Sequence, residues 1–193
     1  KNVPDPKIPM NKLFGTSFNI MDLDEDEIAR QMTLVEFELF AAIQPQEFLN
    51  QAWNLTKLKY RAMNIIKMRQ HYENVKLWVA SSVVTGPKPY DRKHRIKKWI
   101  KVAEYLRNMR NYNSLRAVLD GIDDSAIARM KATQDELATQ SAKQKNELTH
   151  FISEENNYAP YKEALKQKAG EPTIPYLEIH LKDLIFLENV PNY

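Results

Sequence analysis

The chain of 193 residues has the length of a single domain and is long enough to bury a sizeable core. Its formal net charge of +3 at pH 7 does not indicate a nucleic-acid partner, and the lack of cysteine excludes disulfides, thiolate nucleophiles and cysteine-bound metals. The four glycines lie far apart and no window approaches the ~18 apolar residues of a membrane span, so neither a glycine-rich phosphate loop nor a spanning helix is expected.

The first part of the sequence combines an irregular segment with a helix. Residues 1–22 hold several prolines and no regular period, which favours a linker or an N-terminal arm. Asp24 and Glu27 have the spacing of a capping box, and apolar residues then recur at helical steps through about Ile43. Pro45 ends this predicted helix, because proline cannot continue a helix interior.

The middle of the sequence predicts three helices. A short helix over residues 46–54 precedes a long helix over residues 64–84, whose apolar stripe consists of Ile65, Met68, Tyr72, Val75, Val79 and Val83. A turn-rich loop at residues 85–91 leads into a basic helix, with six Lys or Arg within residues 91–101. An anionic membrane or a nucleic acid would attract this basic run, but the helical spacing of the apolar residues beneath it favours a solvated face.

The rest of the sequence continues the helical pattern. Short helices are predicted over residues 114–119 and 126–131, and a further helix over residues 158–168 ends near Gly170, as helices often do at glycine. Residues 133–155 are polar and offer few apolar anchors, which are Leu137, Leu148, Phe151 and Ile152. No convincing period-two strand pattern occurs, so we expect an all-α fold with roughly eight to ten helices.

The last stretch of the sequence is unusually apolar for a surface segment. Pro172 and Pro175 force extended backbone and then permit a helix to begin. Apolar residues cover most of the circumference of this helix, namely Tyr176, Leu177, Ile179, Leu181, Leu184, Ile185, Phe186 and Leu187. Such a helix is either buried on several sides or meets a partner, and periodicity alone favours the buried helix.

Residues able to carry covalent chemistry are scattered along the sequence. The four histidines show no metal-ligand spacing, so each is interpreted as a surface or partly buried residue rather than a ligand. The acidic pairs at residues 123–124 and 154–155 fall in turns, where capping and helix-dipole roles are commoner than acid–base catalysis. We therefore expect neither a metal site nor a cofactor.

A succession of sequence blocks gives a more specific indication. The blocks are Asp24–Phe40, Ile43–Leu49, Ala52–Trp53, Val75–Val79, Ile100–Glu104, Asn111–Leu115, Tyr161–Leu165, Ile174–Leu177 and Leu181–Phe186. In this order they resemble the catalytic domain of Ras-type guanine-nucleotide exchange factors, most specifically over Ile28–Phe40 and Asn111–Leu115. The resemblance extends from about residue 20 to residue 193. We therefore predict an arm over residues 1–22 and a C-terminally incomplete catalytic domain over residues 23–193.

The resemblance implies a fold, an activity and a partner. The family has an irregular all-helical domain with a protruding helical hairpin, of which only the first helix would be present here. It binds a small GTPase of the Ras, Rap or Ral type and lowers that protein's affinity for GDP or GTP without covalent chemistry or a cofactor. The resemblance also implies a cytoplasmic location, with recruitment to membranes through other parts of the parent protein.

One helix of the family's hairpin enters the GTPase, and the segment from Tyr176 to Asn189 is similar to that helix. Ile185 matches the apolar residue that is pushed toward the magnesium site of the GTPase. Asn189 matches a glutamate that bonds the hydroxyl which otherwise ligates magnesium, so the chain departs from the family here. Asparagine accepts such a bond without a charge. Glu188 is the alternative if the helix ends differently.

The resemblance also implies a concave surface that holds the switch region of the GTPase. The residues that match its contacts are Trp53, Arg69, Gln70, Glu73, Leu77, Arg116, Asp123, Tyr158, Tyr176 and Lys182. Arg69 and Arg116 stand where apolar residues are common in the family, and Asp123 stands where asparagine is usual. Asn189, Arg69 and Arg116 keep a second hypothesis open: a catalytically weak or inactive module that binds a GTPase or a scaffold.

Overall fold

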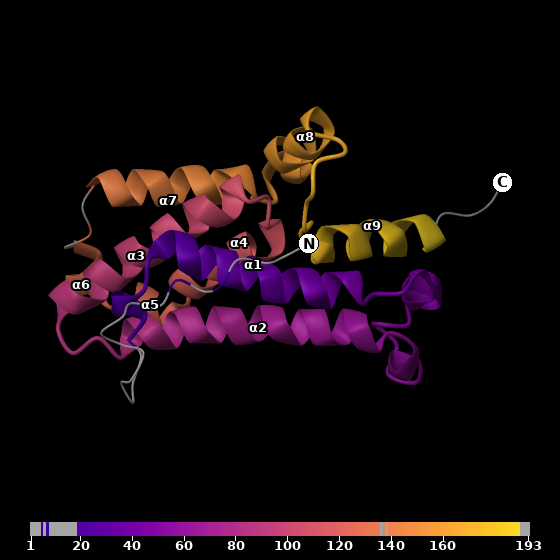
Figure 1. Ribbon diagram of the computed structural model, residues 1–193, viewed down its shortest axis with the longest axis horizontal. Coiled ribbons are helices and arrows are strands. Elements are labelled where there is room, and N and C mark those ends of the chain that lie inside the picture. Colours follow the sequence, from indigo (N-terminus) through magenta and orange to yellow (C-terminus); the bar gives the residue numbers. More distant parts are fainter. Residues whose placement is uncertain (1–4, 6, 8–18, 136, 138, 190–193) are drawn as a thin grey trace.

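The structure, a computed structural model, describes residues 5, 7, 19–135, 137 and 139–189, so most of the predicted arm over residues 1–22 lies outside it. The α-helices are α1 (Glu25–Ala41), α2 (Met63–Val84), α3 (Pro89–Asn108), α4 (Tyr112–Ile122), α5 (Ser125–Ala128), α6 (Lys131–Asp135), α7 (Thr139–Phe151), α8 (Ala159–Gln167) and α9 (Leu177–Asn189) (Figure 1). The 3₁₀ helices are η2 (Ile20–Asp22), η3 (Pro45–Gln51), η4 (Lys59–Arg61) and η5 (Glu155–Tyr158). The described residues otherwise hold one isolated bridge, between Asn111 and Ile174, and no strand. The predicted all-α fold is confirmed.

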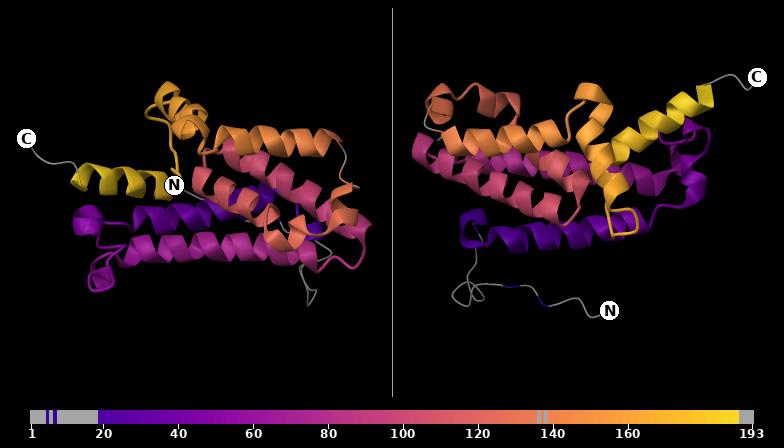
Figure 2. Two further views of the ribbon diagram at one scale, coloured as in Figure 1. Left: turned by 180° about the vertical axis from the view of Figure 1, so that it is seen from behind. Right: turned by 90° about the horizontal axis from the view of Figure 1, so that it is seen from above.

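The long helices run roughly along the longest axis of the domain (Figures 1 and 2). Helix α2 makes its most extensive contact with α4, while α3 packs against both α1 and α4. Helix α7 lies along α3, and the short helices α5 and α6 sit at the end of the domain opposite α8 and α9 (Figure 1). The final helix therefore lies apart from the centre of the bundle.

Two clusters of apolar side chains hold these helices together. The larger cluster joins α1 to α4 with α7 and α8, and Trp99 and Leu115 are fully buried in it. The smaller cluster joins η3, the first turns of α2 and the first half of α9 through residues such as Trp53, Met68 and Leu181. The stripe predicted over residues 64–84 faces these clusters, as its spacing indicated. The first half of α9 thus packs on both clusters, with Ile179 in the larger one and Leu177 and Leu181 in the smaller one.

The contact between α2 and α4 depends on a glycine. A Cβ atom added to Gly121 of α4 would lie 2.7 Å from the backbone oxygen of Lys76 and 2.7 Å from Cβ of Val79, both on α2. Real Cβ atoms do not approach other heavy atoms so closely, and protein interiors have few voids to absorb the strain. Glycine is therefore required here because the two helix backbones touch.

The basic helix α3 has the buried apolar face that its spacing predicted, but its basic face is only partly solvated: Lys101 is exposed, whereas Arg92 and Arg95 are partly buried and bond within the domain. Its apolar positions are all buried, namely Ile96, Trp99, Ile100, Ala103 and Leu106. Lys98 is an exception, because it is itself buried and reaches Glu25 of α1 at 3.7 Å and the carbonyl of Leu23. None of the described helices is both long and apolar enough to cross a bilayer.

Several local predictions need correction. Asp24 does occupy the position before α1, but its side chain makes no capping hydrogen bond. Glu27 turns instead to Arg30, whose Nη2 lies 2.7 Å from Glu27 Oε1, so the predicted capping box is wrong. The helix expected over residues 46–54 is the 3₁₀ helix η3, and the one expected over residues 126–131 is divided between α5 and α6. These elements are too short for helical periodicity to define their ends.

Candidate functional site

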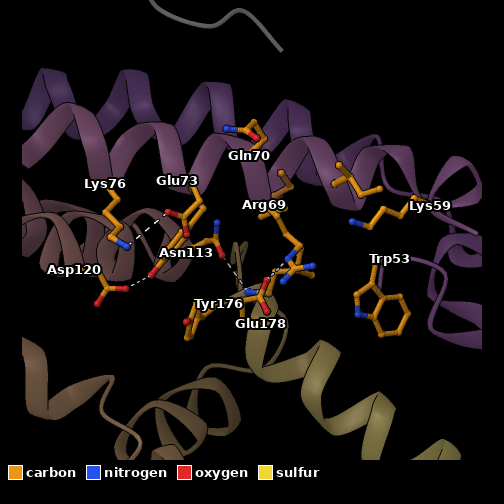
Figure 3. A pocket seen from close by; sticks show the side chains of 14 residues that line it. Trp53, Lys59, Arg69, Gln70, Glu73, Lys76, Asn113, Asp120, Tyr176 and Glu178 are labelled. Atoms are coloured by element: carbon orange, nitrogen blue, oxygen red, sulfur yellow. Dashed lines mark hydrogen bonds and ion pairs between the residues drawn. The ribbon is translucent and has the colours of Figure 1, made fainter. Parts of the chain in front are cut away.

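A cavity of about 470 Å³ opens between α2, α4 and the beginning of α9 (Figure 3). Five of the residues predicted to bind a GTPase line it, namely Trp53, Arg69, Gln70, Glu73 and Tyr176. Trp53 follows η3, the next three project from α2, and Tyr176 directly precedes α9. Residues that are far apart in the sequence thus come together around one concave surface.

Aromatic rings form one side of this cavity. The ring of Tyr72 stacks on that of Tyr176, with centroids 6.0 Å apart and an interplanar angle of 21°. Tyr158 packs edge-on against Tyr176 at 6.4 Å. Burial raises the pKa of Tyr72 and, together with a hydrogen bond to Glu154, that of Tyr158, so both phenols stay neutral and can donate hydrogen bonds at physiological pH. The rings offer an apolar surface with polar edges.

An acidic and a basic side chain support these rings from α4. Tyr72 donates a hydrogen bond from its hydroxyl to Asp120. Arg116 lies one turn before Asp120, with its Nε 2.9 Å from Asp120 Oδ1, and it donates to the carbonyl of Ile152 at 3.0 Å. Arg116 does not line the cavity itself, and its guanidinium is engaged within the domain. In this structure it supports Tyr72 through Asp120.

An ion pair connects the two helices that flank the cavity. Arg69 Nε of α2 lies 2.5 Å from Glu178 Oε1 of α9 (Figure 3). Both side chains are partly exposed, at 43% and 29%. Close by on α2, Gln70 donates to Asn74 at 3.1 Å and Glu73 lies 3.6 Å from Lys76. The polar rim of the cavity is therefore charged and open to solvent.

Tyr158 is held by an unusual backbone turn. It has φ 58° and follows Asn156 and Asn157, which also have positive φ, so three successive residues are left-handed. Asparagine tolerates this conformation better than most residues, whereas for tyrosine it costs energy that packing must offset. The Tyr158 hydroxyl donates to Glu154 Oε1 at 2.7 Å, and Lys182 of α9 reaches the same oxygen at 3.2 Å. The bond from Tyr158 and the nearby Lys182 hold the pKa of the Glu154 carboxyl below its usual range.

Besides Arg116, Tyr158 and Lys182, two further predicted contact residues, Leu77 and Asp123, do not line the cavity. Leu77 is 57% exposed on α2, one turn beyond Glu73. Asp123 follows the end of α4 and forms an ion pair with Lys145 of α7. Their predicted roles require a partner that extends past the cavity along α2 and α4.

The second half of α9 differs from the first. Leu177, Ile179 and Leu181 are buried, and Ile185 is partly buried against the smaller core. Phe186 and Leu187 are 70% and 65% exposed, and Glu188 and Asn189 are exposed as well. Asn189 donates its side-chain amide to the carbonyl of Ile185 at 2.9 Å. The first half of this helix is core, as the buried interpretation predicted, and its second half leaves apolar side chains in solvent, for which contact with a partner stays a prediction.

Several residues of the site were not singled out by the sequence. Tyr72 was assigned to the apolar stripe, although its hydroxyl binds Asp120; the i, i+4 spacing of Arg116 and Asp120 was the one sequence indication of this cluster. Glu178 and Glu154 gave no comparable indication. Across the described part of the chain, no group of His, Asp or Glu side chains is arranged to hold a metal ion.

An aromatic cavity beside an exposed apolar helix end is typical of a domain that binds another protein. The family model of the RasGEF domain matches residues 27–193. Ras guanine nucleotide exchange factor A of Dictyostelium discoideum is 40% identical over 192 residues, which cover 100% of this chain and 31% of that protein. Exchange factor J of the same organism is 39% identical over 186 residues, covering 96% and 23%.

The chain therefore belongs to the RasGEF domain family. It spans less than a third of the length of the curated relatives just described.

Proposed function

We propose that the chain promotes release of GDP from a Ras-family small GTPase, of the Ras, Rap or Ral type. In this proposal the cavity and the exposed face of α2 hold the switch region, and α9 enters near the magnesium and phosphate site. The observation that carries the proposal is the exposed apolar end of α9, with Phe186 and Leu187, beside a cavity with aromatic walls. Membership of the RasGEF family and the names of its relatives support it.

The activity needs no covalent chemistry. A protein that binds the GTPase and distorts its nucleotide site weakens nucleotide binding, and the nucleotide weakens that protein's binding by the same factor. Each ~1.4 kcal/mol of coupling between the two ligands lowers nucleotide affinity tenfold. The exchange factor therefore needs enough interface to bind the nucleotide-free GTPase tightly, and rebinding of nucleotide then displaces it.

The end of α9 supplies the residues that would act on the nucleotide site. Ile185 would present its apolar side chain toward magnesium. Asn189 Oδ1 accepts no hydrogen bond from any residue that the structure describes, so it is available to the hydroxyl that ligates magnesium. Glu188, exposed on the same turn, carries the charge that Asn189 lacks. We propose that one of these two side chains removes the magnesium ligand.

The concave surface would supply the docking contacts. Tyr176, which is partly exposed, and Leu77, which is 57% exposed, offer apolar surface of the kind that anchors protein interfaces, whereas Tyr158 and Trp53 are 7% and 2% exposed and would present little more than a ring edge. Arg69 is exposed enough to meet an acidic residue of the partner, although it must first leave Glu178. Gln70, Glu73, Asp123 and Lys182 would form the polar rim. Arg116 stays a predicted contact, with a second role as the support of Tyr72.

A second candidate function is a binding module that holds a GTPase without accelerating exchange. The observation that favours it is Asn189 in place of the family's glutamate. The two functions share the docking surface and differ only in what the end of α9 does after docking.

Release of a fluorescent GDP analogue from Ras-, Rap- and Ral-type GTPases separates these functions. Exchange activity predicts accelerated release from at least one of them, with tight binding to its nucleotide-free form. Tight binding without acceleration on any GTPase would instead establish the binding module. Absence of both would overturn the proposed partner class.

We further propose that the parent protein is cytoplasmic and is recruited to the membrane that carries the GTPase. Other parts of the parent protein would supply most of this recruitment. The solvated face of α3, which includes Lys97 and Lys101, is a candidate contribution within this chain, because clustered cations are attracted to anionic lipid. Sedimentation with phosphatidylserine-containing vesicles and with neutral vesicles tests it: equal sedimentation would rule out a contribution from α3.

A further inference from the structure

Helix α9 begins without a capping residue of its own. The positions just before Leu177 are Ile174, Pro175 and Tyr176, and none of these side chains can accept a hydrogen bond from the first amides in the way that Ser, Thr, Asp or Asn does. The first N–H groups of a helix have no partner within the helix and need one from elsewhere. In α9 two of these amides find partners on other helices.

The partners are a buried asparagine and a buried tyrosine. Leu177 N–H donates to Asn113 Oδ1 of α4 at 3.1 Å, as the dashed line in Figure 3 marks. Tyr176 N–H donates to the hydroxyl of Tyr161 of α8 at 3.0 Å. Asn113 and Tyr161 are 2% and 0% exposed, so water does not compete for these bonds. The start of α9 is thus capped by side chains of two other helices of the same chain, α4 and α8.

Asn113 is in turn fixed from the opposite side. Its Nδ2 donates to Glu36 Oε1 of α1 at 2.6 Å, and Ser114 donates its hydroxyl to Glu36 Oε2. Burial raises the pKa of the Glu36 carboxyl, while the bonds from Ser114 and Asn113 act against that rise. A single amide group therefore spans α1, α4 and α9, and it has no freedom to rotate without losing a buried hydrogen bond.

The segment before α9 is held to the beginning of α4 as well. Tyr112 N–H donates to the carbonyl of Ile174 at 2.9 Å, and Ile174 N–H donates to the carbonyl of Arg110 at 3.0 Å. These backbone bonds fix the position of residue 174. They leave the direction of the helix that follows to Asn113 and Tyr161.

Direction matters because, among the described residues, the far half of α9 packs on the domain through the partly buried Leu184 and Ile185, while Phe186 and Leu187 are exposed. At about 1.5 Å of rise per residue, Ile185 lies about 12 Å from Leu177 along the axis, so a tilt of about 10° moves it by about 2 Å. Errors of ~1 Å in the position of a reacting group can cost up to ~100-fold in rate. A small change in the capping bonds at the start of α9 therefore becomes a larger displacement of Ile185 near its end.

We propose that Asn113 is a positioning residue for the proposed exchange reaction: its side-chain oxygen caps the first turn of α9 from α4 and sets the direction in which Ile185 points. This inference rests on the proposed function. Within the block Asn111–Leu115, the polar side chains have different partners. Asn111 caps α4 through the Ser114 amide at 3.0 Å, Ser114 and Asn113 hold Glu36, and Asn113 alone reaches α9.

The test compares Asn113→Ala with Ser114→Ala. Each substitution removes one hydrogen bond to Glu36, but only Asn113→Ala releases the amide of Leu177. We expect Asn113→Ala to lower the exchange rate at saturating exchange factor by about 10- to 100-fold, with affinity for the nucleotide-free GTPase changed less than about threefold. Ser114→Ala should keep the wild-type rate. Equal losses in the two variants, or equal losses of rate and affinity in Asn113→Ala, would overturn the proposal.

Hydrogen exchange supplies a readout that does not depend on activity. Protection of the Leu177 amide should fall in Asn113→Ala and persist in Ser114→Ala. If the wild-type protein accelerates no GTPase, the proposed function fails, while this comparison still decides whether Asn113 caps α9. If the protein is active and Asn113→Ala loses the protection but keeps the full rate, the positioning role fails and the proposed function stands.

A reciprocal pair of substitutions guards against a variant that does not fold. Asn113→Asp keeps an acceptor for Leu177 N–H but places a second carboxylate beside Glu36. Adding Glu36→Gln restores a hydrogen bond between the two side chains in the opposite direction, because the amide at position 36 then donates to the carboxylate at position 113. The double variant should therefore recover Leu177 protection and most of the exchange rate. A folded double variant with neither would overturn the proposal.

Discussion

The two sides of the cavity are held in place by different forces. On one side, α2 and α4 touch backbone to backbone at Gly121, and close packing fixes their spacing. On the other, α9 is anchored by a few hydrogen bonds and apolar side chains at its start, and its far end exposes Phe186 and Leu187. The proposed docking surface is thus rigid, whereas the element proposed to act on the nucleotide is a lever whose direction depends on a few polar atoms and on the apolar side chains packed beside them.

The largest expected effect is on the rigid side. Gly121→Ala would place a Cβ 2.7 Å from a backbone oxygen of α2, which cannot move as a side chain can. Overpacking of this kind costs about 1–3 kcal/mol, and we expect the upper part of that range, measured by urea unfolding. Gly170→Ala is the control, because Gly170 has open space around it and only its φ of 93° opposes a side chain. Gly170→Ala measures the cost of backbone strain alone, and a loss below about 1 kcal/mol in Gly121→Ala would show that α2 and α4 are not in close contact.

The next effect concerns the far end of the lever. Ile185→Ala should slow GDP release by at least about tenfold, equivalent to ~1.4 kcal/mol, while docking to the nucleotide-free GTPase weakens less. Leu187→Ala is the comparison for docking, because it removes an exposed apolar side chain that the proposed function places against the partner, so its affinity should decline at least as much as its rate. Rate and affinity that decline together in Ile185→Ala would mean that this residue contributes to docking alone.

A pH series distinguishes two buried carboxylates with opposite effects. Burial of Glu47 raises its pKa, but hydrogen bonds from the Asn64 side chain at 2.7 Å and from the amides of Gln44, Asn64 and Ile65 outweigh burial and hold it below 4.5. Because the unfolded chain binds this proton more readily, Glu47 adds stability that is complete above pH 4.5 and is lost as pH falls through its folded pKa. Glu47→Gln should lower stability at neutral pH by about 1–2 kcal/mol and flatten the acid limb.

Glu36 has the opposite effect on how stability changes with pH. Burial holds its pKa above 4.5, so the folded protein binds the proton more tightly and stability declines as pH rises from 4.5 through the folded pKa. Glu36→Gln should remove that decline. Urea unfolding from about pH 3 to about pH 8 measures both variants. If stability depended on pH in the same way in the two variants, the opposite effects assigned to Glu47, at the beginning of α2, and Glu36, at the junction of α1, α4 and α9, would be contradicted.

The smallest effect is expected at the ion pair between the two sides. Arg69 and Glu178 are partly exposed, and exposed pairs contribute about 0–1 kcal/mol. A double-mutant cycle with Arg69→Ala and Glu178→Ala should give a coupling energy within that range that shrinks in high salt. A salt-independent coupling above that range would mean that the pair, rather than Asn113, holds α9 in place.

Much of the fold follows from the sequence because long helices repeat their pattern many times. The stripe from Ile65 to Val83 defines α2 over six turns, and its predicted bounds differ from the observed ones by a single residue. The segments η3, α5 and α6 offer no such repetition. Asp24 and Glu27 have the spacing of a capping box, yet Glu27 binds Arg30 instead. Spacing alone does not show which of two possible partners a side chain will bind.

The site, like the fold, has a part that the sequence predicted and a part that it did not. Trp53, Arg69, Gln70, Glu73 and Tyr176 gather around one cavity, as the family resemblance implied, while their roles in binding stay a prediction. The polar groups that hold the site together were not found, because a bond such as that between Asn113 and Leu177 joins residues with no local relation in the sequence. Arg116 gave the opposite difficulty, since a charged residue expected at the surface is engaged with Asp120.

Because α9 is capped by residues made much earlier in the chain, its capping bonds form late during synthesis. Asn113 and Leu177 are separated by 64 residues, so a ribosome that adds about 5–20 residues per second makes Leu177 about 3–13 s after Asn113. The amide of Tyr112 waits a similar time for the carbonyl of Ile174. Water must satisfy these groups of α4 in the meantime. Among the helices that the structure describes, α9 is made after the others and completes the core that they assemble.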